Sequence, residues 1–123
     1  MQLLAIAGGG AIGALLRFWG ANWVYGLLGR DFPYGTLVVN IAGSLAMGFC
    51  YVLFMERLSA GPELRAFVMV GLLGAFTTFS TFSIETFNLI EAGELMKAVS
   101  NMVLSTVLCV AAAWLGVLAG RQL

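Results

Sequence analysis

The stretch Gly71-Leu-Leu-Gly-Ala-Phe-Thr-Thr-Phe-Ser-Thr-Phe-Ser83 decides both the fold of this chain and the place of its function. It combines hydroxyls, phenylalanines and two glycines within an otherwise apolar run. Polar side chains at membrane depth are costly unless they face protein or water, so such a cluster marks a functional site. Membrane anchoring alone does not require this mixture. The stretch therefore predicts a path lined for a small polar solute.

The composition around this stretch is that of an integral membrane protein. The 123 residues are 61% hydrophobic and 10% charged, none is histidine, and the mean hydropathy is +0.99. A spanning helix needs roughly 20 apolar residues, so the length allows four spans with short connections and no soluble domain. Charged and turn-forming residues predict one four-helix transmembrane domain over 1–123, with spans at about 3–25, 34–55, 66–90 and 99–119.

The start of the chain and its two cysteines fit this interpretation. The first residues lack the basic region and the cleavage site of a secretory signal, so we expect them to begin the first span. Cys50 and Cys109 both fall within expected spans, where free thiols behave as small hydrophobic groups. Their number and spacing indicate no metal site, and we expect no organic cofactor and no nucleic-acid partner.

The charges on the two sides of the expected bundle are nearly balanced. One side holds Arg57, Arg65 and Arg121, and the other holds Arg30 and Lys97, with Arg17 leaning the same way. Membrane orientation normally follows the Lys/Arg excess on the cytoplasmic side. Two interpretations remain open: the small difference selects one topology, or copies insert both ways and pair as an antiparallel homodimer. Four short helices enclose little volume, so we expect a homo-oligomer.

Small residues and aromatic residues predict how the helices pack and where they meet the interface. Small residues share one helical face in Gly9-xxx-Gly13, Ser44-xxx-Gly48 and Ala112-xxx-Gly116-xxx-Gly120, which allows close backbone approach in lipid. An interfacial aromatic belt is expected at Trp19, Trp23 and Tyr25, and more weakly at Trp114.

Polar side chains within the spans form more than helix packing requires. Asn40 alone is best explained by an interhelical hydrogen bond. Two stripes accompany it, each on one helical face. They consist of Thr78, Thr81, Glu85 and Asn88 in the third span, and Asn101, Ser105 and Cys109 in the fourth.

Arg17 and Glu85 are the ionisable residues inside the spans. Ending the first span before Arg17 leaves too few residues to cross a core of roughly 30 Å, so Arg17 is placed within the membrane boundary. It either extends its guanidinium toward water or attracts anions. Glu85 either reaches the interface, pairs with a cation, or acts as a titratable transport residue.

The residue types favour a small anion as the solute. The cluster from Thr77 to Ser83 holds hydroxyl donors and no carboxylate. Phe76, Phe79 and Phe82 recur every three residues, and an aromatic ring has a positive edge that can face an anion. Removing water from a small ion costs on the order of tens of kcal/mol in a low dielectric. Donors and ring edges must therefore replace that hydration together.

Gly71 and Gly74, followed by Thr77 and Thr78, predict a break in the third span. Glycine is conformationally permissive, and threonine can bond its own backbone. Interrupted helices expose carbonyl oxygens, which bind Na⁺ in some transporters. A packing kink is the alternative.

Three motifs resemble those of the small fluoride channels, the Fluc or CrcB family. They are Gly8-Gly-Gly-Ala-Ile-Gly-Ala-Leu-Leu-Arg-Phe18, Gly35-Thr-Leu-Val-Val-Asn-Ile-Ala-Gly43 and Gly74-Ala-Phe-Thr-Thr-Phe-Ser-Thr-Phe-Ser83. The resemblance covers effectively the whole chain. It implies a dual-topology antiparallel homodimer of four-helix subunits in a bacterial inner membrane. It also implies two pores that export cytoplasmic fluoride passively, and a structural Na⁺ at the dimer centre.

The resemblance also assigns residues by motif position. Asn40 resembles the pore asparagine, and Phe79 and Phe82 resemble the phenylalanines whose edges face fluoride. The remaining assignments are Ser80, Thr81 and Ser83 to the hydroxyl track, Ser105 to the pathway in span four, Arg17 and Glu85 to the vestibule, and the backbone carbonyls of Gly74 and Thr77 to Na⁺. Asn101 stands where some relatives carry an aromatic hydroxyl.

Three other functional classes are alternatives: an exporter, an enzyme, and a non-transporting assembly subunit, which would explain the helices but not the polar stripes. A small dual-topology, proton-coupled multidrug exporter would use Glu85, but such an exporter should carry a carboxylate in its first span, and this chain has none there. An enzyme lacks obvious acid–base residues, because there is no histidine and no carboxylate pair at membrane depth. We therefore expect a channel and not an enzyme.

Overall fold

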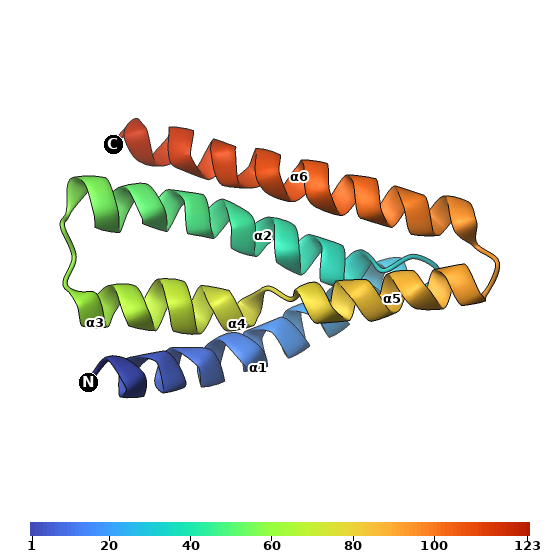
Figure 1. Cartoon of the computed structure of the whole chain (residues 1–123), viewed down its shortest axis with the longest axis horizontal. Coiled ribbons are helices and arrows are strands. Elements are labelled where there is room, and N and C mark those ends of the chain that lie inside the picture. The colour runs from blue at the N-terminus through green and yellow to red at the C-terminus, as the bar shows by residue number, and fades with distance from the viewer.

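The computed structural model of the protein describes residues 1–123, which form helices joined by short turns (Figure 1). The elements are α1 (Gln2–Leu28), α2 (Tyr34–Tyr51), the π-helical η1 (Val52–Arg57), α3 (Pro62–Arg65), the π-helical η2 (Ala66–Leu73), α4 (Gly74–Phe76), α5 (Phe79–Glu91) and α6 (Leu95–Arg121). Four runs are long and apolar enough to span a membrane: Gln2–Leu28, Tyr34–Arg57, Pro62–Glu91 and Leu95–Arg121. The expected all-helical class with four spanning helices is confirmed.

Several helices extend beyond the expected spans. α1 continues past residue 25 to Leu28, and α6 begins at Leu95 instead of at residue 99. Hydropathy marks the part of a helix that fits the hydrocarbon core, whereas backbone hydrogen bonding continues into the polar interface. In the first turn of α6, Lys97 Nζ donates to the Asp31 carbonyl at 3.3 Å and lies 3.8 Å from Glu94 Oε2. These polar contacts stabilise a helix end that hydropathy does not detect.

The four runs alternate in direction, so both termini lie at the same end of the bundle (Figure 1). α6 packs along α2, and α1 packs along η2. The turns that follow α1 and α5 meet at the opposite end. This arrangement places Arg30 and Lys97 at one end of the bundle, and the η1, α3 and C-terminal arginines at the other.

Glycines set the distances between the paired helices. A Cβ atom on Gly9 would lie 2.2 Å from the Phe67 carbonyl oxygen, and one on Gly13 would lie 2.1 Å from that of Leu72. On the other side of the bundle, a Cβ on Gly48 would lie 2.0 Å from the carbonyl oxygen of Ala113. Real Cβ contacts are not this short, so no other residue fits at these positions without separating the backbones. The predicted small-residue packing of the first, second and fourth spans is confirmed.

The third run is not helical at Thr77 and Thr78, between α4 and α5. Thr77 has φ −91° and ψ 158°, and Thr78 has φ −150° and ψ 122°, so both are extended. Thr78 caps α5, because its Oγ1 accepts from the Thr81 amide at 3.1 Å. Gly71 and Gly74 themselves keep helical geometry, and Gly71 instead lets α1 approach, since a Cβ there would lie 2.7 Å from the Ile6 carbonyl oxygen. The local conformation changes at the threonines, beyond both glycines.

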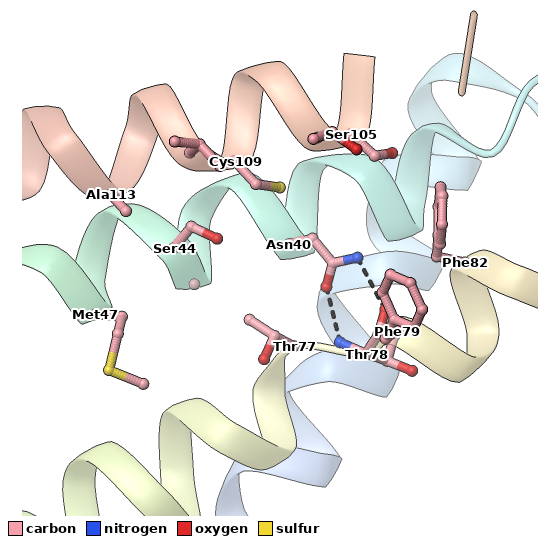
Figure 2. A pocket seen from close by; sticks show the side chains of 13 residues that line it. Asn40, Ser44, Met47, Thr77, Thr78, Phe79, Phe82, Ser105, Cys109 and Ala113 are labelled. Carbon is pink, nitrogen blue, oxygen red and sulfur yellow. Dashed lines mark hydrogen bonds between the residues drawn. The ribbon is translucent and has the colours of Figure 1, made fainter. Parts of the chain in front are cut away.

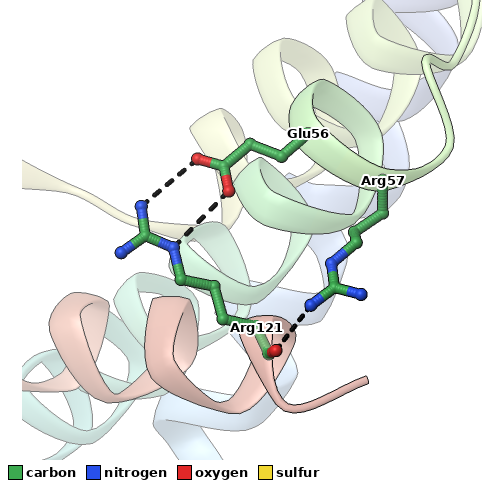
Figure 3. A network of polar contacts seen from close by, with 3 residues as sticks. All are labelled: Glu56, Arg57 and Arg121. Carbon is green, nitrogen blue, oxygen red and sulfur yellow. Dashed lines mark hydrogen bonds and ion pairs between the residues drawn. The ribbon is translucent and has the colours of Figure 1, made fainter.

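The end of α6 is held to η1 by charged groups (Figure 3). Arg121 Nη2 lies 3.3 Å from Glu56 Oε2, and the Arg57 guanidinium donates to the Arg121 carbonyl. The second contact provides a partner for a carbonyl at the helix terminus. Exposed ion pairs contribute about 0–1 kcal/mol, so this cluster orients the helix end more than it stabilises the bundle.

Most apolar side chains lie on the outside of the bundle. Only 22 of the 123 residues are buried, and Trp19 and Trp23 are 60% and 69% exposed. An exterior of this kind requires lipid or another protein surface as its environment. Tyr25 does not belong to the predicted interfacial belt: it is 9% exposed, because its side chain turns inward to hydrogen-bond within the bundle.

Candidate ion pathway

A cavity of about 450 Å³, the largest of three described here, lies between α2, α6 and the start of α5 (Figure 2). α2 contributes Asn40 and Ser44 to its wall, α6 contributes Ser105 and Cys109, and Phe79 and Phe82 enter from α5. The wall contains amide, hydroxyl, thiol and aromatic groups and no charged side chain. Such a wall offers hydrogen-bond donors without a fixed charge. We call it the central cavity.

Two smaller cavities continue from the central cavity toward the end of the bundle that carries Arg30. The middle cavity, of about 110 Å³, shares Thr78 with the central cavity and is also lined by Arg17 and Thr81. The outer cavity, of about 220 Å³, is lined by Arg30 and Asp31 among others. The middle and outer cavities share Tyr25 and Glu85. The three cavities therefore form a series along the bundle.

Asn40 holds the non-helical segment in place. Its Nδ2 donates to the Thr78 carbonyl at 3.0 Å, and its Oδ1 accepts from the Thr78 amide at 2.8 Å (Figure 2). The side chain is 9% exposed and lines the central cavity. An amide nitrogen carries two hydrogens, so one donor remains after these contacts. Asn40 thus combines a structural role with an available donor at the cavity wall.

Phe79 and Phe82 stand at the α5 side of the central cavity. Their ring centroids are 5.3 Å apart and the planes are inclined by 41°. Phe79 is 79% exposed and stands at the rim of the central cavity. Phe76, the third member of the predicted stripe, does not line the cavity and instead packs on α2 near Gly43. Phe79 and Phe82 therefore line the central cavity, whereas Phe76 contributes to helix packing.

The hydroxyls predicted for the pathway differ in their hydrogen bonds and in whether they reach a cavity. Thr78 Oγ1 donates to Thr81 Oγ1 at 3.1 Å and lies 3.3 Å from Ser80 Oγ. Ser83 Oγ donates to the Phe79 carbonyl at 2.9 Å. Of these predicted residues, Thr81 lines the middle cavity and Ser105 lines the central cavity, whereas Ser80 and Ser83 are exposed and line none of the three cavities.

Arg17 and Glu85 line the same middle cavity without forming an ion pair within 4 Å. Arg17 Nε donates to the Ala75 carbonyl at 3.0 Å, which links α1 to α4. Glu85 Oε2 accepts from the Tyr25 hydroxyl at 2.8 Å, while its Oε1 is buried without a partner. Glu85 thus does not pair with a cation, and a guanidinium and a carboxylate face one small cavity separately.

Asn101 lies outside the pathway, in contrast to the stripe predicted on the fourth span. It is 2% exposed, and its Nδ2 donates to Thr86 Oγ1 at 2.9 Å. Its Oδ1 accepts from Ser105 Oγ at 3.3 Å. Asn101 therefore joins α6 to α5, and Ser105 and Cys109 are the members of that stripe that reach the central cavity.

The carbonyls of Gly74 and Thr77 lose their helical partners at the non-helical segment. In a continuous helix the Thr78 amide would bond the Gly74 carbonyl, but it donates to Asn40 Oδ1. The Thr81 amide would bond the Thr77 carbonyl, but it donates to Thr78 Oγ1. The Thr77 hydroxyl is engaged with the Leu73 carbonyl at 3.1 Å. Each residue therefore presents a main-chain oxygen as its available ligand, and such oxygens fit a hard cation.

Residues 4–117 match the family described as CrcB-like protein, Camphor Resistance (CrcB). The chain belongs to the CrcB family. It is 52% identical to a protein of Coxiella burnetii (strain Dugway 5J108-111) over the full length of both chains, and 48% identical to one of Hydrogenovibrio crunogenus, with 99% of this chain and 92% of that relative covered. A relative from Methylococcus capsulatus is 56% identical over the whole of this chain, which spans 54% of that longer protein.

These relatives in the CrcB family are each named fluoride-specific ion channel FluC. The resemblance stated from the three motifs is thereby confirmed. The family is one of ion channels and not of enzymes. Nothing in the comparisons supports the alternative of a multidrug exporter.

Tyr25 and Thr36 are among the residues that line the cavities of this CrcB-family chain and that were not predicted as site residues. Tyr25 was taken for an interfacial anchor, and Thr36, which is 5% exposed, was not singled out. Both line the middle cavity, and their hydroxyls lie 3.4 Å apart. The available signal was helical spacing, because Thr36 lies four residues before Asn40 and Tyr25 lies eight residues after Arg17, which places each pair near the same helical face. Only the crossing of α1, α2 and α5 brings them together.

Proposed function

We propose that this chain is the subunit of a fluoride-specific channel that lets cytoplasmic fluoride leave passively across a bacterial inner membrane. The observation that carries the proposal is the series of three cavities within the spanning helices, from Arg30 at one end to Cys109 beyond the non-helical segment. The names of the relatives supply the identity of the ion. Passive flow needs no coupling residue, so the direction follows the fluoride gradient.

The chemistry of the wall suits a small, strongly hydrated anion. Dehydrating such an ion costs on the order of tens of kcal/mol, so donors must replace water along the path. Asn40 has one unused N–H, and the hydroxyls of Thr81 and Ser105 reach the middle and central cavities. The edges of Phe79 and Phe82 add positive partial charge. In this proposal Ser80 and Ser83 extend the hydroxyl track on the exposed face of α5.

Arg17 and Glu85 form the vestibule in this proposal. The guanidinium of Arg17 attracts anions into the middle cavity, which it lines. The carboxylate of Glu85 stands at the boundary of the outer cavity. Because the two groups are not paired, the positive charge of Arg17 remains available to an anion.

The functional unit in this proposal is an antiparallel homodimer with two pores. The near balance of Lys and Arg at the two ends of the bundle supports insertion in both orientations. The large exposed fraction of Phe79 supports a second protein surface over the rim of the central cavity. In a dimer with a two-fold axis, the same surface of each subunit would cover that of the other.

The proposal includes a structural Na⁺ between the subunits, held by the main-chain carbonyls of Gly74 and Thr77. Both oxygens have lost their helical donors, which makes them suitable ligands for this cation. When bound, the ion would supply positive charge near the anion paths. The Thr77 hydroxyl is engaged with the Leu73 carbonyl, so the main-chain oxygen is the ligand that Thr77 has left.

The test is ion efflux from liposomes that contain the purified protein. A fluoride electrode measures the fluoride released from loaded vesicles. Vesicles with the protein should release fluoride far faster than protein-free vesicles, while their chloride release should equal that of protein-free vesicles. A folded preparation that releases no fluoride, or that releases chloride equally well, would show that the function is different.

A further inference from the structure

The outer and middle cavities meet at a single pair of side chains. Tyr25 and Glu85 are the two residues common to both walls. On the proposed path from the Arg30 end toward Thr78, an ion crosses between or beside these two groups. The contacts that hold these two side chains therefore determine the opening between the outer and middle cavities.

The side chain of Tyr25 is held from several sides. Its ring lies against Gly35, where an added Cβ would be 2.4 Å from Tyr25 Cε2. The Arg30 guanidinium stands 4.4 Å from the ring centroid, at cation–π distance. The hydroxyl lies 3.4 Å from Thr36 Oγ1 and donates to Glu85 Oε2 at 2.8 Å. The phenol is thus a fixed donor.

Glu85, in contrast, depends on this donor. The Tyr25 hydroxyl is the one hydrogen-bond partner of its carboxylate, because Oε1 is buried without any. No cation lies within 4 Å of it, although Arg17 lines the same middle cavity. A buried carboxylate gains most from an opposite charge when one is within reach. Arg17 is the one cationic side chain on the wall of the middle cavity, and Arg30, which stacks on the Tyr25 ring, is the one on the wall of the outer cavity.

We propose that Tyr25 is a positioning residue that keeps Glu85 from pairing with Arg17. The inference rests on the proposed fluoride conduction and names a residue that this conduction requires. With the hydroxyl present, the carboxylate stays at the boundary with the outer cavity, and Arg17 is free to attract an anion. Without it, the carboxylate turns into the middle cavity, neutralises Arg17 and occupies the place of the anion.

The test compares fluoride efflux of Tyr25→Phe with that of the unmodified dimer. This change removes one oxygen and keeps the ring packing on Gly35 and Arg30. Because a hydrogen bond to a charged acceptor is worth a tenfold or larger change in an equilibrium, flux should fall about tenfold. The matched control is Tyr34→Phe, at the start of α2, whose hydroxyl has no hydrogen-bond partner and which should leave flux unchanged.

A double-mutant cycle identifies Glu85 as the group through which Tyr25 acts. In a Glu85→Gln background no carboxylate can neutralise Arg17, so adding Tyr25→Phe should change flux less than twofold. Glu85→Asp keeps the charge but withdraws it from the Tyr25 hydroxyl, so it should lower flux as Tyr25→Phe does. Dimer content and melting temperature are measured for every variant. A positioning role leaves the dimer content unchanged, and flux is compared at equal dimer content because loss of the hydrogen bond itself lowers the melting temperature.

Three outcomes would overturn the inference while fluoride conduction itself stands. They are normal flux in Tyr25→Phe, normal flux in Glu85→Asp, and an equal loss from Tyr25→Phe in the Glu85→Gln background. If the unmodified protein conducts no fluoride, the proposed function fails instead, and the two failures are distinguishable.

Discussion

Asn40 serves the amide and the carbonyl of Thr78 with one side chain, so its substitution affects structure and pathway together. Asn40→Asp keeps the shape and the acceptor but replaces Nδ2, the donor to Thr78, with an oxygen. We expect a loss of about 1–3 kcal/mol in stability, and a fall in fluoride flux of more than tenfold because an ionised carboxylate repels the anion. Thermal unfolding and liposome efflux measure the two effects.

Asn101→Asp is the control for this prediction. It removes the donor to Thr86 Oγ1 from a buried amide that lines none of the three cavities. It should lower the melting temperature comparably, with flux per folded dimer preserved. Equal flux in Asn40→Asp and the unmodified dimer would remove Asn40 from the pathway.

Phe82 tests the role of ring edges. Phe82→Ile keeps apolar volume at the central cavity but removes the polarised C–H edge, so flux should fall about tenfold with the dimer intact. The control is Phe87→Ile, on the same helix but 51% exposed and outside the three cavities, which should conduct normally. Both are compared at equal dimer content in liposomes. If the two variants behave alike, ring edges at Phe82 contribute nothing specific.

The two cysteines provide a chemical probe of the central cavity. Cys109 lines it and Cys50 does not. An anionic methanethiosulfonate reagent forms a mixed disulfide with a thiolate, releases sulfinate and leaves a sulfonate in place. We expect treatment to abolish most flux in the unmodified protein and in Cys50→Ala, and to leave Cys109→Ala at its own untreated rate. Block that persists in Cys109→Ala would place the path away from this wall.

At the scale of the element, the non-helical segment depends on the cap at the start of α5. Thr78→Ala removes the oxygen that accepts from the Thr81 amide and should lower stability by about 1 kcal/mol. Ser80→Ala, which removes only a 3.3 Å contact from an exposed side chain, should have little effect. Chemical denaturation of the two variants measures the difference. A Thr78→Ala protein as stable as the Ser80→Ala control would show that α5 does not need this cap.

The position of this segment shows how far an element can be predicted. The motif from Gly71 to Ser83 predicted a break in the third span, from glycines that are permissive and from threonines that can bond their own backbone. Gly71 is used for close packing on α1, and the extended residues are Thr77 and Thr78. The decisive group is Asn40 on another helix, which takes the Thr78 amide. A contact between two helices cannot be read from either one alone.

At the scale of the whole molecule, the balance of charges between the two ends leads to a test of assembly. If copies insert in both orientations, labels attached at the C-terminus should be accessible from both faces of a membrane in a functional preparation. Impermeant reagents applied to sealed vesicles, before and after lysis, measure the two fractions. Labelling from one face alone, in vesicles that conduct fluoride, would leave a single topology as the explanation.

The overall bundle was predictable because lipid imposes simple rules on length and hydropathy. Four spans and the small-residue contacts followed from the chain itself, and so did the family. The lining of the cavities was only partly predictable. Asn40, Phe79, Phe82 and Ser105 were singled out and line the central cavity, but Tyr25 joined the site through the crossing of α1 with α5. Because Tyr25 follows Trp19 and Trp23 in the sequence, it was predicted to belong to an interfacial aromatic belt.

The backbone contacts at Gly9, Gly13 and Gly48 also bear on how such a chain evolves. These positions accept no side chain, whereas an added Cβ at Gly26 meets nothing within 4 Å. Substitutions at these glycines would separate α2 from α6, and α1 from η2. Phe79 and Phe82 lie on α5, which has no glycine contact of this kind. Exchanges of residues on α5 can then change the wall of the central cavity and leave the frame of the bundle intact.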